Sequence, residues 1–438
     1  MSERAEAAAA QPIQGARAWI VLSALAAGLA AGAFASSLGD GLREPALRAA
    51  SMVGGLWLDA LKMTVIPLIV ALLVTGVAKG AEAARAGRIA GRSILWFFIV
   101  CTSSAVFGAV MMPLLLDLFP LPQSAADAMR AGLAALDPGS VPDTVPQVAD
   151  FFRTIIPANV VAAASNGDVL QLVVFALLFA LAITRIDAAK RRAIVNFFDA
   201  IADALLVVIG WVLWVAPLGV FALAFAVGAG AGGAAFAGVL HYIVLVSALG
   251  ILVTLAAYVV AWLAGGYSPL AFGRGMIAPQ AVAISTQSSL ASLPAMLAAA
   301  RLMGVSQRVA DVTLPLAVAL FRATGPAMNI AVAIYVAHWL GIEISTANMV
   351  AGIAVAAVVS YGAVSLPGQI SFFTSIAPIA IAMGVPPGPL ALLVAVENIP
   401  DIFRTVGNVT MDVAATTAVD RSAGKGDRDG DGKADAAS

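Results

Sequence analysis

Long apolar segments without a charged residue constrain this chain more than any other feature. Neither Ala18–Leu38 nor Tyr242–Gly265 contains an Asp, Glu, Lys or Arg. About 20 apolar residues suffice for a helix to cross a hydrocarbon core of about 30 Å. The chain is 61% hydrophobic and 11% charged, whereas a soluble domain has about half and a quarter. Because lipid offers the backbone no hydrogen-bond partner, we predict an all-α polytopic membrane protein.

Eight membrane helices are expected from the apolar pattern. They are placed at residues 17–37, 52–77, 93–117, 154–185, 191–228, 236–264, 308–340 and 387–418. Two further regions, 267–304 and 345–386, are apolar but interrupted by Ser, Gly and Pro. The polar start, residues 1–17, is too long and too acidic for a cleaved signal. The first apolar segment is therefore read as a retained helix.

The loop charges predict the orientation. Residues 79–92 and 185–192 are rich in Lys and Arg, whereas 117–150 carries five Asp against one Arg. The positive-inside bias makes the first two loops cytoplasmic, and eight spans then place both termini in the cytoplasm. The expected location is the inner cell membrane, with the bilayer as one partner. A net charge of −1 suggests no nucleic-acid partner, and the single cysteine, Cys101, reads as a packing residue.

Both interrupted regions place a Ser/Gly/Pro cluster between apolar arms. The first reads AISTQSSLASLPAM, 283–296, and the second VSYGAVSLPGQIS, 359–371. Irregular backbone at membrane depth is tolerated only where it faces protein, water or a ligand. Two re-entrant hairpins in corresponding halves indicate a transporter built on inverted repeats, with helix N-termini directed at an anion. Simple Gly/Pro kinks in ordinary spans are the alternative.

The segment VENIPDIFRTVGNVTMD, 396–412, is unusually polar for so apolar a chain. At 100° per residue, its charged and amide side chains fall within an arc of about 80°; they are Glu397, Asp401, Arg404, Asn408 and Asp412. A charge at the bilayer centre costs at least about 2.5–3.5 kcal/mol. This polar stripe therefore needs mutual partners, water or a bound polar ligand.

The alternating charges of the stripe suit an anionic or zwitterionic solute. Arg404 offers a planar fork for a carboxylate, and Asp401 can accept from an ammonium group. Asp412 and Asn408 offer hard oxygen ligands for a small cation. A purely structural ion-pair network is the alternative.

These residues resemble the glutamate transporter homologue family, the dicarboxylate/amino acid:cation symporters. LKMTVIPLIVALLVTGVA resembles that family's second helix, IIPANVVAAASNGDVLQLVVFALLFALAI its fourth and VAPLGVFAL its fifth. SSLASLP and SLPG resemble the tips of its two hairpins. The last helix of the family reads Asp-x-x-x-Asp-x-x-Arg-Thr-x-x-Asn-x-x-x-Asp, and 397–412 matches it with Glu397 at the first position.

The resemblance implies a role for each matching residue. Asp401 would hold a substrate amino group and Arg404 a side-chain carboxylate, while Thr405 and Asn408 would contact polar groups. The main-chain carboxylate would be bound by the hairpin tips, at Ser288, Ser289, Ser365, Pro367 and Gly368. Sodium ligands would come from Asp412 and Asn408 and from residues near Ser360, Tyr361 and Ala363.

The resemblance also implies a homotrimer in which a transport domain slides along a scaffold, an elevator. Scaffold helices 1 and 2 would occupy 1–92, transport-domain helix 3 93–120, and scaffold helices 4 and 5 121–230. The transport-domain core would cover 231–419, with hairpins at 267–304 and 345–386. Residues 420–438 would form a disordered cytoplasmic tail. Its DRDGDGKAD segment has calcium-loop spacing but lacks the final glutamate, so a solvated tail is the preferred interpretation.

The seventh helix departs from the family pattern. Sodium-coupled members carry Asn-Met-Asp-Gly-Thr, whereas this chain reads LFRATGPAMN, 320–329. With one residue inserted, Phe321 and Arg322 replace the first two, and Ala323 or Thr324 replaces the aspartate. Gln287 stands where some members carry an arginine before the hairpin serines. Arg322 either replaces that arginine and pairs with Asp401 or Glu397, or it occupies the space of a bound cation.

We therefore expect at least one sodium site to be lost, with coupling to fewer Na⁺ or to H⁺ and with no cofactor. Glu397 is the candidate proton carrier, because an apolar setting favours a neutral carboxyl group. Both Arg322 and Glu397 are thus coupling or charge-compensating candidates.

The expected function is secondary active symport of an acidic amino acid or a dicarboxylate, and no enzyme activity is expected. A C4-dicarboxylate, or cystine or another polar amino acid, is the alternative substrate. Arg322 could neutralise Asp401 and so favour a substrate without an amino group. A passive channel and an intramembrane serine hydrolase are remote alternatives; the hydrolase would need a His or Lys base beside Ser288 or Ser289.

Overall fold

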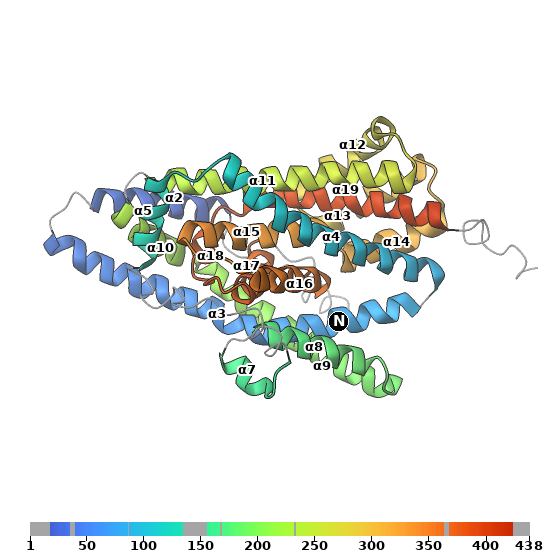
Figure 1. Cartoon of the computed structure of the whole chain (residues 1–438), viewed down its shortest axis with the longest axis horizontal. Coiled ribbons are helices and arrows are strands. Elements are labelled where there is room, and N and C mark those ends of the chain that lie inside the picture. Colours follow the sequence, from blue (N-terminus) through green and yellow to red (C-terminus); the bar gives the residue numbers. More distant parts are fainter. Residues whose placement is uncertain are drawn as a thin grey trace, which may run out of the picture.

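A computed structural model of the chain describes residues 18–35, 40–85, 87–134, 156–166, 169–231, 234–362 and 368–423. All regular elements in these ranges are helical (Figure 1). Along the chain they are α2 (Ala18–Ala35), α3 (Asp40–Arg85), α4 (Arg88–Leu118), α5 (Gln123–Ala134), α7 (Val160–Asn166), α8 (Val169–Ile183), α9 (Ala188–Trp214), α10 (Ala216–Ala231), α11 (Ala234–Val260), η1 (Ala261–Gly265), α12 (Pro269–Thr286), α13 (Ser289–Leu302), α14 (Gln307–Leu320), α15 (Thr324–Leu340), α16 (Thr346–Gly362), α17 (Gly368–Ala382), α18 (Leu390–Leu393) and α19 (Asn398–Ser422). The predicted start at 1–17 and the tail sequence DRDGDGKAD lie outside the described residues.

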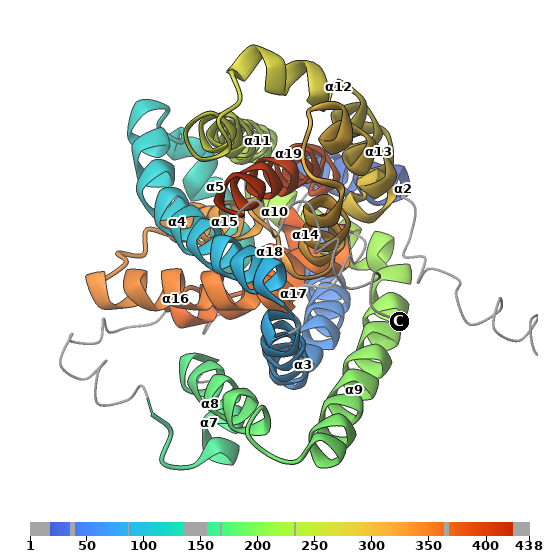
Figure 2. The same ribbon diagram turned by 90° about the vertical axis from the view of Figure 1, so that its right-hand side faces the viewer.

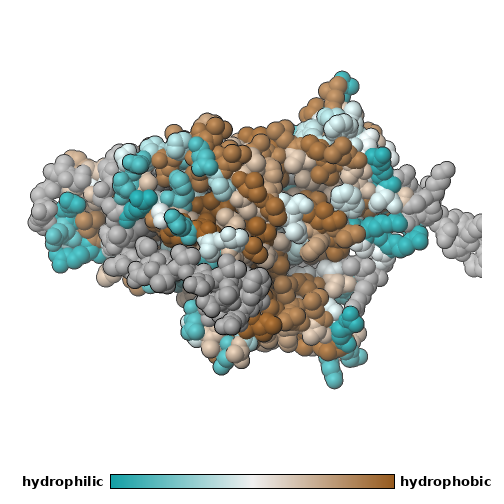
Figure 3. Space-filling model, in the orientation of Figure 1, coloured by the Kyte–Doolittle hydropathy of each residue, from teal (hydrophilic) through white to brown (hydrophobic). Residues whose placement is uncertain are grey.

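Five segments of the described chain are long and apolar enough to cross a membrane. They are Arg43–Glu82, Arg88–Leu118, Ala188–Trp214, Phe236–Gly265 and Gln307–Leu340. On the face seen in Figure 3, apolar side chains fill the middle and hydrophilic ones gather toward both ends of the long axis. The class predicted from the sequence, an all-helical membrane protein, is thereby confirmed, while the number of spans stays a prediction.

One group of helices combines α2, α3, α8, α9 and α10. α10 packs on both α2 and α3, and α3 packs on α8 and α9. The approach of α2 to α10 is close because glycines face backbone: a Cβ on Gly28 would lie 2.5 Å from the Phe221 carbonyl oxygen. Gly32 and Gly228 make similarly close contacts with the opposite helix. Gly28 and Gly32 have the small-xxx-small spacing that lets membrane helices approach closely.

A second group surrounds α19. In Figures 1 and 2 this helix lies among α4, α11, α14 and α15, and it also packs on α12 and α13. Its side chains are buried from Asp401 to Asp420 on nearly every face. The most polar of the long helices is therefore the one that the others enclose.

Three of the expected continuous spans contain a break. Segment 191–228 is divided at Val215 into α9 and α10, with Pro217 in the first turn of α10, where proline is tolerated. Segment 308–340 is divided at Phe321–Ala323 into α14 and α15, and segment 387–418 into α18 and α19. The apolar pattern continues across the break at Val215, whereas the other two breaks carry the charged residues Arg322 and Glu397 in otherwise apolar sequence.

The two interrupted regions each contain a pair of packed helices. Region 267–304 consists of α12 and α13, joined at Gln287 and Ser288. Region 345–386 consists of α16 and α17, which also pack on each other. Its connecting residues, 363–367, lie outside the described ranges.

Candidate functional site

The polar stripe predicted at 397–412 is buried inside the protein. Glu397 and Asp412 have no exposed surface, and Asp401, Arg404 and Asn408 are at most 8% exposed. Four of these residues lie within α19, and Glu397 immediately precedes its first residue. Thr405, on the flank of the stripe, is also buried. The ionisable groups of these side chains lie close together where water is excluded, so the charge of each group depends on the charges of the others.

Glu397 and Arg404 form a buried ion pair, with 2.8 Å between Oε1 and Nη2. The alignment is poor for hydrogen bonding: within the described residues, both Glu397 oxygens and the Arg404 Nε and Nη2 have no hydrogen-bond partner. Tyr242 of α11 and Asp401 are the other polar neighbours of Glu397. The Nε–Nη2 edge of a guanidinium group is the edge that binds a carboxylate in bidentate fashion. Arg404 therefore keeps a donor edge that a second carboxylate can use.

Arg322 lies in the break between α14 and α15. Its guanidinium group interacts electrostatically with Asp412 and Asp401. A cation at a helix N-terminus is opposed by the helix dipole, and Arg322 stands just before α15 begins at Thr324. The two carboxylates supply the negative charge that this position requires. Because the ion partner of Glu397 is Arg404, Arg322 is placed beside Asp412 and Asp401.

The break itself is held by α4. Phe97 stacks on Phe321 with ring centroids 4.4 Å apart, and the Ser104 hydroxyl donates to the Ala323 carbonyl. A Cβ on Gly108 would collide with Ala327, so α4 and α15 meet backbone to backbone. These three contacts fix the break that carries Arg322 against α4.

Asp412 differs from the other polar residues of α19. The hydroxyls of Thr410, Thr416 and Thr417 donate to carbonyls of their own helix, at 2.6–2.7 Å. Neither carboxylate oxygen of Asp412 accepts a hydrogen bond from the described residues, and its charged neighbour is Arg322. A buried carboxylate without hydrogen bonds is costly unless a cation compensates it. The site thus has an acceptor suited to a small cation, with a guanidinium group beside it.

Asn408 has a structural use that the sequence did not indicate. Its Oδ1 accepts from the Thr324 backbone NH at 2.9 Å and from the Thr324 hydroxyl at 2.7 Å. The same hydroxyl lies 2.9 Å from the Arg404 carbonyl oxygen. Asn408 therefore caps the first turn of α15 from another helix, and its oxygen is already engaged. Only the amide nitrogen of this side chain remains for a substrate.

The tip of the first hairpin is a helix N-terminus. Gln287 adopts a left-handed backbone, with φ 50°, and Ser288 follows as the N-cap of α13. The Ser288 Oγ accepts from the Ala291 NH at 3.2 Å, so this side chain caps the helix. One arm reaches α19, because Gln280 of α12 donates to the Thr410 hydroxyl at 3.0 Å; Thr410 lies on the face of α19 opposite to the stripe. Ser289 is buried at the first position of α13, where backbone NH groups lack helical acceptors.

Fewer of the second-hairpin residues can be examined. Ser365, Pro367 and Ala363 lie outside the described ranges, and Gly368 is the first residue of α17. Ser360 is buried, and its hydroxyl donates to the Ala356 carbonyl at 2.8 Å. Tyr361 faces Cys101 of α4, and Cys101 in turn neighbours Arg322 and Asp412. Cys101 packs in the core as expected, but against the site.

Sequence reasoning found the stripe and missed three of its neighbours. All three, Thr324, Tyr242 and Ser104, come from other helices, and nothing in the local sequence of Tyr242 or Ser104 distinguishes them. For Thr324 a signal was present, since it follows the altered residues of the seventh helix. Together these groups form a buried site with two guanidinium groups and three carboxylates. The guanidinium groups are suited to bind an anion, and the carboxylates are suited to bind a small cation or a proton.

Comparison with known proteins gives one family. A model described as "Sodium:dicarboxylate symporter family" matches residues 18–422. The C4-dicarboxylate transport protein of Rhizobium etli is 28% identical over 413 residues, covering 92% of this chain and 88% of the relative. The proton/glutamate-aspartate symporter of Escherichia coli is 26% identical, covering 94% of both. The proton/sodium-glutamate symport protein of Bacillus subtilis is 28% identical, covering 84% and 85%.

Proposed function

The chain belongs to the sodium:dicarboxylate symporter family, and we propose that it carries a C4-dicarboxylate or acidic amino acid into the cell with H⁺ or a reduced number of Na⁺. Symport of a small anion, and not enzyme catalysis, is the activity of this family and of the similar proteins. The observation that carries the finer proposal is the position of Arg322 beside Asp401 and Asp412.

Arg404 is the proposed anchor for one substrate carboxylate. Its Nε–Nη2 edge carries no hydrogen bond from the described residues, although Nη2 contacts Glu397. The second carboxylate would be bound by the hairpin tips. On one side the NH of Ser289 at the start of α13 would contribute, because the Ser288 NH already donates to the Thr286 hydroxyl at 3.3 Å; on the other side residues 365–368 would contribute. Thr405 and the Asn408 amide nitrogen would complete the polar wall. Helix N-termini and arginine forks are the usual anion-binding groups of proteins.

The environment of Asp401 bears on the choice of substrate. Arg404 and Arg322 both act on this carboxylate, so much of its charge is already compensated. An ammonium group would have to compete with two guanidinium groups for Asp401. A dicarboxylate without an amino group, such as succinate, therefore fits the site best. Aspartate is the second candidate, because Asp401 still lies on the substrate side of α19; cystine or another polar amino acid would leave an arginine without a carboxylate.

The coupling proposal rests on two different carboxylates. Arg322 would hold Asp412 partly compensated at all times, which removes one reason for a sodium ion to bind there. Na⁺ would keep a weaker site formed by Asp412 and residues near Ser360, Tyr361 and Ala363, because the Asn408 Oδ1 is already engaged by Thr324. Glu397 would carry the proton: when neutral it releases Arg404 to the substrate, and when ionised it competes with the substrate carboxylate.

An elevator movement is proposed from the two groups of helices. The first hairpin packs on α19 together with α4, α11, α14 and α15, whereas α2, α3, α8, α9 and α10 pack largely on one another; the second hairpin packs on α4 and α15 and also on α3. The group of α2, α3, α8, α9 and α10 would be the scaffold, from 1–92 and 121–230. The group around α19 would be the moving domain, from 93–120 and 231–419. We propose a homotrimer in the inner membrane with both termini in the cytoplasm.

The test is uptake of radiolabelled substrates into proteoliposomes that contain the purified protein. Succinate and L-aspartate are each offered with an inward Na⁺ gradient alone and with an inward H⁺ gradient alone. We expect accumulation of succinate above equilibrium with the H⁺ gradient and weaker accumulation with Na⁺. Preference for L-aspartate would show that Asp401 remains available to an ammonium group, and uptake that only reaches equilibrium would indicate a channel.

A further inference from the structure

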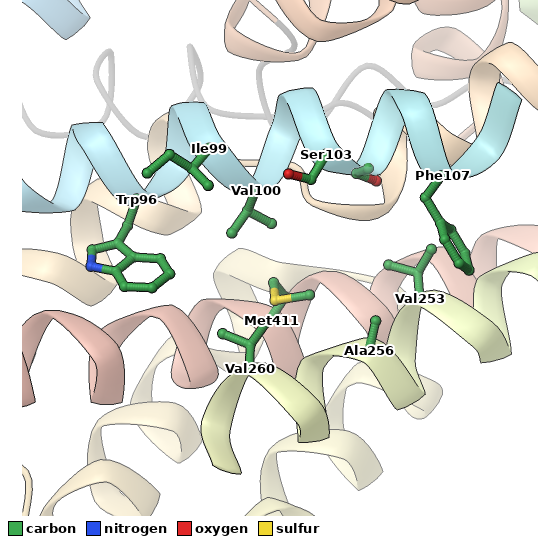
Figure 4. A pocket seen from close by; sticks show the side chains of 10 residues that line it. Trp96, Ile99, Val100, Ser103, Phe107, Val253, Ala256, Val260 and Met411 are labelled. Carbon is green, nitrogen blue, oxygen red and sulfur yellow. The ribbon is translucent and has the colours of Figure 1, made fainter. Parts of the chain in front are cut away.

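An apolar groove lies between α4 and α11, on the side of α19 that carries Met411. It has a volume of about 260 Å³. Figure 4 shows side chains from both helices directed into it, with Trp96 at one end and Phe107 at the other. Val100, Val253 and Met411 form its buried floor. The floor itself is apolar; of the two serines that line the groove, Ser103 is exposed and Ser104 already donates to the Ala323 carbonyl.

The groove opens toward the lipid side of the molecule. Both bordering helices are segments long and apolar enough to span a membrane. On α4 the exposed side chains that flank the groove include Leu95 and Val106. On α11 they include Leu255 and Val259. Exposed leucine, valine and phenylalanine in a membrane-spanning helix face acyl chains, so the medium at the mouth of the groove is hydrocarbon.

One end of the groove is basic. On α4, Arg92 precedes the lining residue Trp96 by one helical turn, and Arg88 precedes Arg92 by another turn, so the two arginines extend this side of the helix beyond the groove. α4 and α11 run in opposite directions in Figure 4, so this end also holds the end of α11. There the Arg421 guanidinium group of α19 donates to the Leu263 carbonyl at 3.3 Å. Asp420 is the nearby acid, and it accepts from the Ser306 NH.

From this juxtaposition we propose that the groove binds one acyl chain of a phospholipid whose anionic headgroup lies against Arg88, Arg92 and Arg421. The three arginines stand at the end that the loop charges place in the cytoplasm, where anionic lipid attracts clusters of Lys and Arg. The length from Trp96 to Phe107 along α4, about 16 Å at 1.5 Å per residue, matches one leaflet of a hydrocarbon core about 30 Å thick.

The proposed lipid would contact parts that hold the transport site. Met411 in the floor precedes Asp412, and Ser104 in the wall fixes the carbonyl next to Arg322. An acyl chain would fill the space behind both residues. The ligand class, a phospholipid, is different from the transported substrate, so this proposal stands whether or not the substrate proposal is correct.

Lipid binding is measured by native mass spectrometry of the delipidated full-length protein in detergent. Palmitoyl-oleoyl phosphatidylglycerol is titrated against phosphatidylcholine with the same chains. We expect tighter binding of phosphatidylglycerol, and the loss of one bound molecule per chain in Ala256→Trp and in Ser103→Trp, which fill the groove from opposite walls. Leu255→Trp adds the same side chain on the lipid side of α11 and should bind like the wild type.

The headgroup contact is tested without altering the groove. Arg88→Gln with Arg92→Gln should weaken phosphatidylglycerol binding by about fivefold per arginine and leave phosphatidylcholine unchanged. Arg191→Gln with Arg192→Gln, in the other basic loop, is the matched control and should change neither.

Three results would overturn the proposal. Ala256→Trp and Ser103→Trp could retain the full number of bound lipids, which would mean that the groove holds none. Leu255→Trp could lose lipid equally, which would mean that binding is general to the surface. Disulfide-linked dimers of Ser103→Cys would mean that a second copy of the chain covers the groove.

Discussion

At the scale of single residues, the position of Arg322 decides what this site can bind. Its guanidinium group cannot leave during a transport cycle, whereas a coupling ion must bind and dissociate. It lies beside Asp412 and Asp401 and just before the N-terminus of α15, where the helix dipole disfavours a cation. A permanent positive charge is therefore held beside Asp412, the carboxylate that we propose as a ligand of a mobile cation.

Replacing this charge should restore a need for a mobile cation. We expect Arg322→Met to lower uptake without sodium by more than about tenfold, because removing one partner of a buried charge pair costs about 3–5 kcal/mol. Added Na⁺ should recover part of the loss. The measurement is initial uptake rate against Na⁺ concentration, with Arg191→Met as the control. A variant whose residual uptake stays indifferent to Na⁺ would contradict the surrogate-cation role.

Glu397→Gln should separate proton coupling from substrate binding. The amide keeps the shape of the side chain but leaves Arg404 without its ionic partner. We expect accumulation driven by an H⁺ gradient to disappear while exchange of internal for external substrate continues. The measurement compares gradient-driven uptake with counterflow in the same proteoliposomes. Glu343→Gln, at an exposed position, is the control; undiminished H⁺-driven accumulation in Glu397→Gln would exclude this residue as the carrier.

Asn408→Ala should destabilise the protein without any substrate present. The side chain caps α15 through the Thr324 backbone NH, and loss of an N-cap interaction costs about 0.5–2 kcal/mol. Thr417→Ala is a suitable comparison, because its hydroxyl bonds only within α19. Thermal unfolding in detergent should show a lower Tm for the first variant than for the second. Equal Tm values would mean that Asn408 serves the substrate and contributes little as a cap.

The sequence predicted the site residues better than their pairing. Helical periodicity alone places five polar side chains on one face, and all five are buried. That Glu397 pairs with Arg404 depends on the turn before α19, and that Asn408 binds Thr324 depends on the break in another helix. Ser288 was expected to contact the substrate, yet its side chain accepts from the Ala291 NH. Such pairings arise from tertiary contacts, which a local pattern does not contain.

At the scale of elements, the predicted hairpin regions and most helix positions agree with the structure, while the breaks do not follow from hydropathy. The Ser/Gly/Pro clusters predicted the divisions at 287–288 and after Gly362 because their residues disfavour a continuous helix. The division at Val215 occurs in apolar sequence, and the one at Phe321–Ala323 contains the single charged residue Arg322. The second is held by Phe97 and Ser104 of α4, so packing determines it.

The close contact of α2 with α10 should be sensitive to side-chain volume. Gly28 faces the Phe221 carbonyl and the Ala224 side chain, so Gly28→Ile forces the helices apart. Overpacking of this kind costs about 1–3 kcal/mol. Ala30→Ile places the same side chain on the exposed side of α2 and should be tolerated. Thermal unfolding and the yield of folded protein in detergent compare the two; similar behaviour would mean that α2 is free to move away from α10.

At the scale of the whole molecule, movement of one helix group along the other can be stopped by a cross-link. A Cβ on Gly388 would lie 3.7 Å from the Leu58 side chain of α3. This contact lies between the proposed moving domain, which contains Gly388, and the proposed scaffold, which contains Leu58. Oxidation of a Leu58→Cys, Gly388→Cys variant, with Cys101→Ala to remove the native thiol, should abolish uptake and spare substrate binding. Reductant should restore uptake. The Leu58→Cys variant alone is the control, and transport by the oxidised pair would argue against sliding at this contact.

The burial of α19 also bears on how the protein is made. This helix follows every other described helix in the chain, and it is absent from the five segments apolar enough to span a membrane unaided. A segment with this many ionisable groups gains little from entering lipid alone. We therefore expect its insertion during biogenesis to depend on the helices synthesised earlier, which must first assemble a partly polar cavity that accepts α19. The helix that we propose to hold the transport site is thus the one that we expect to depend most on the rest of the chain for its integration into the membrane.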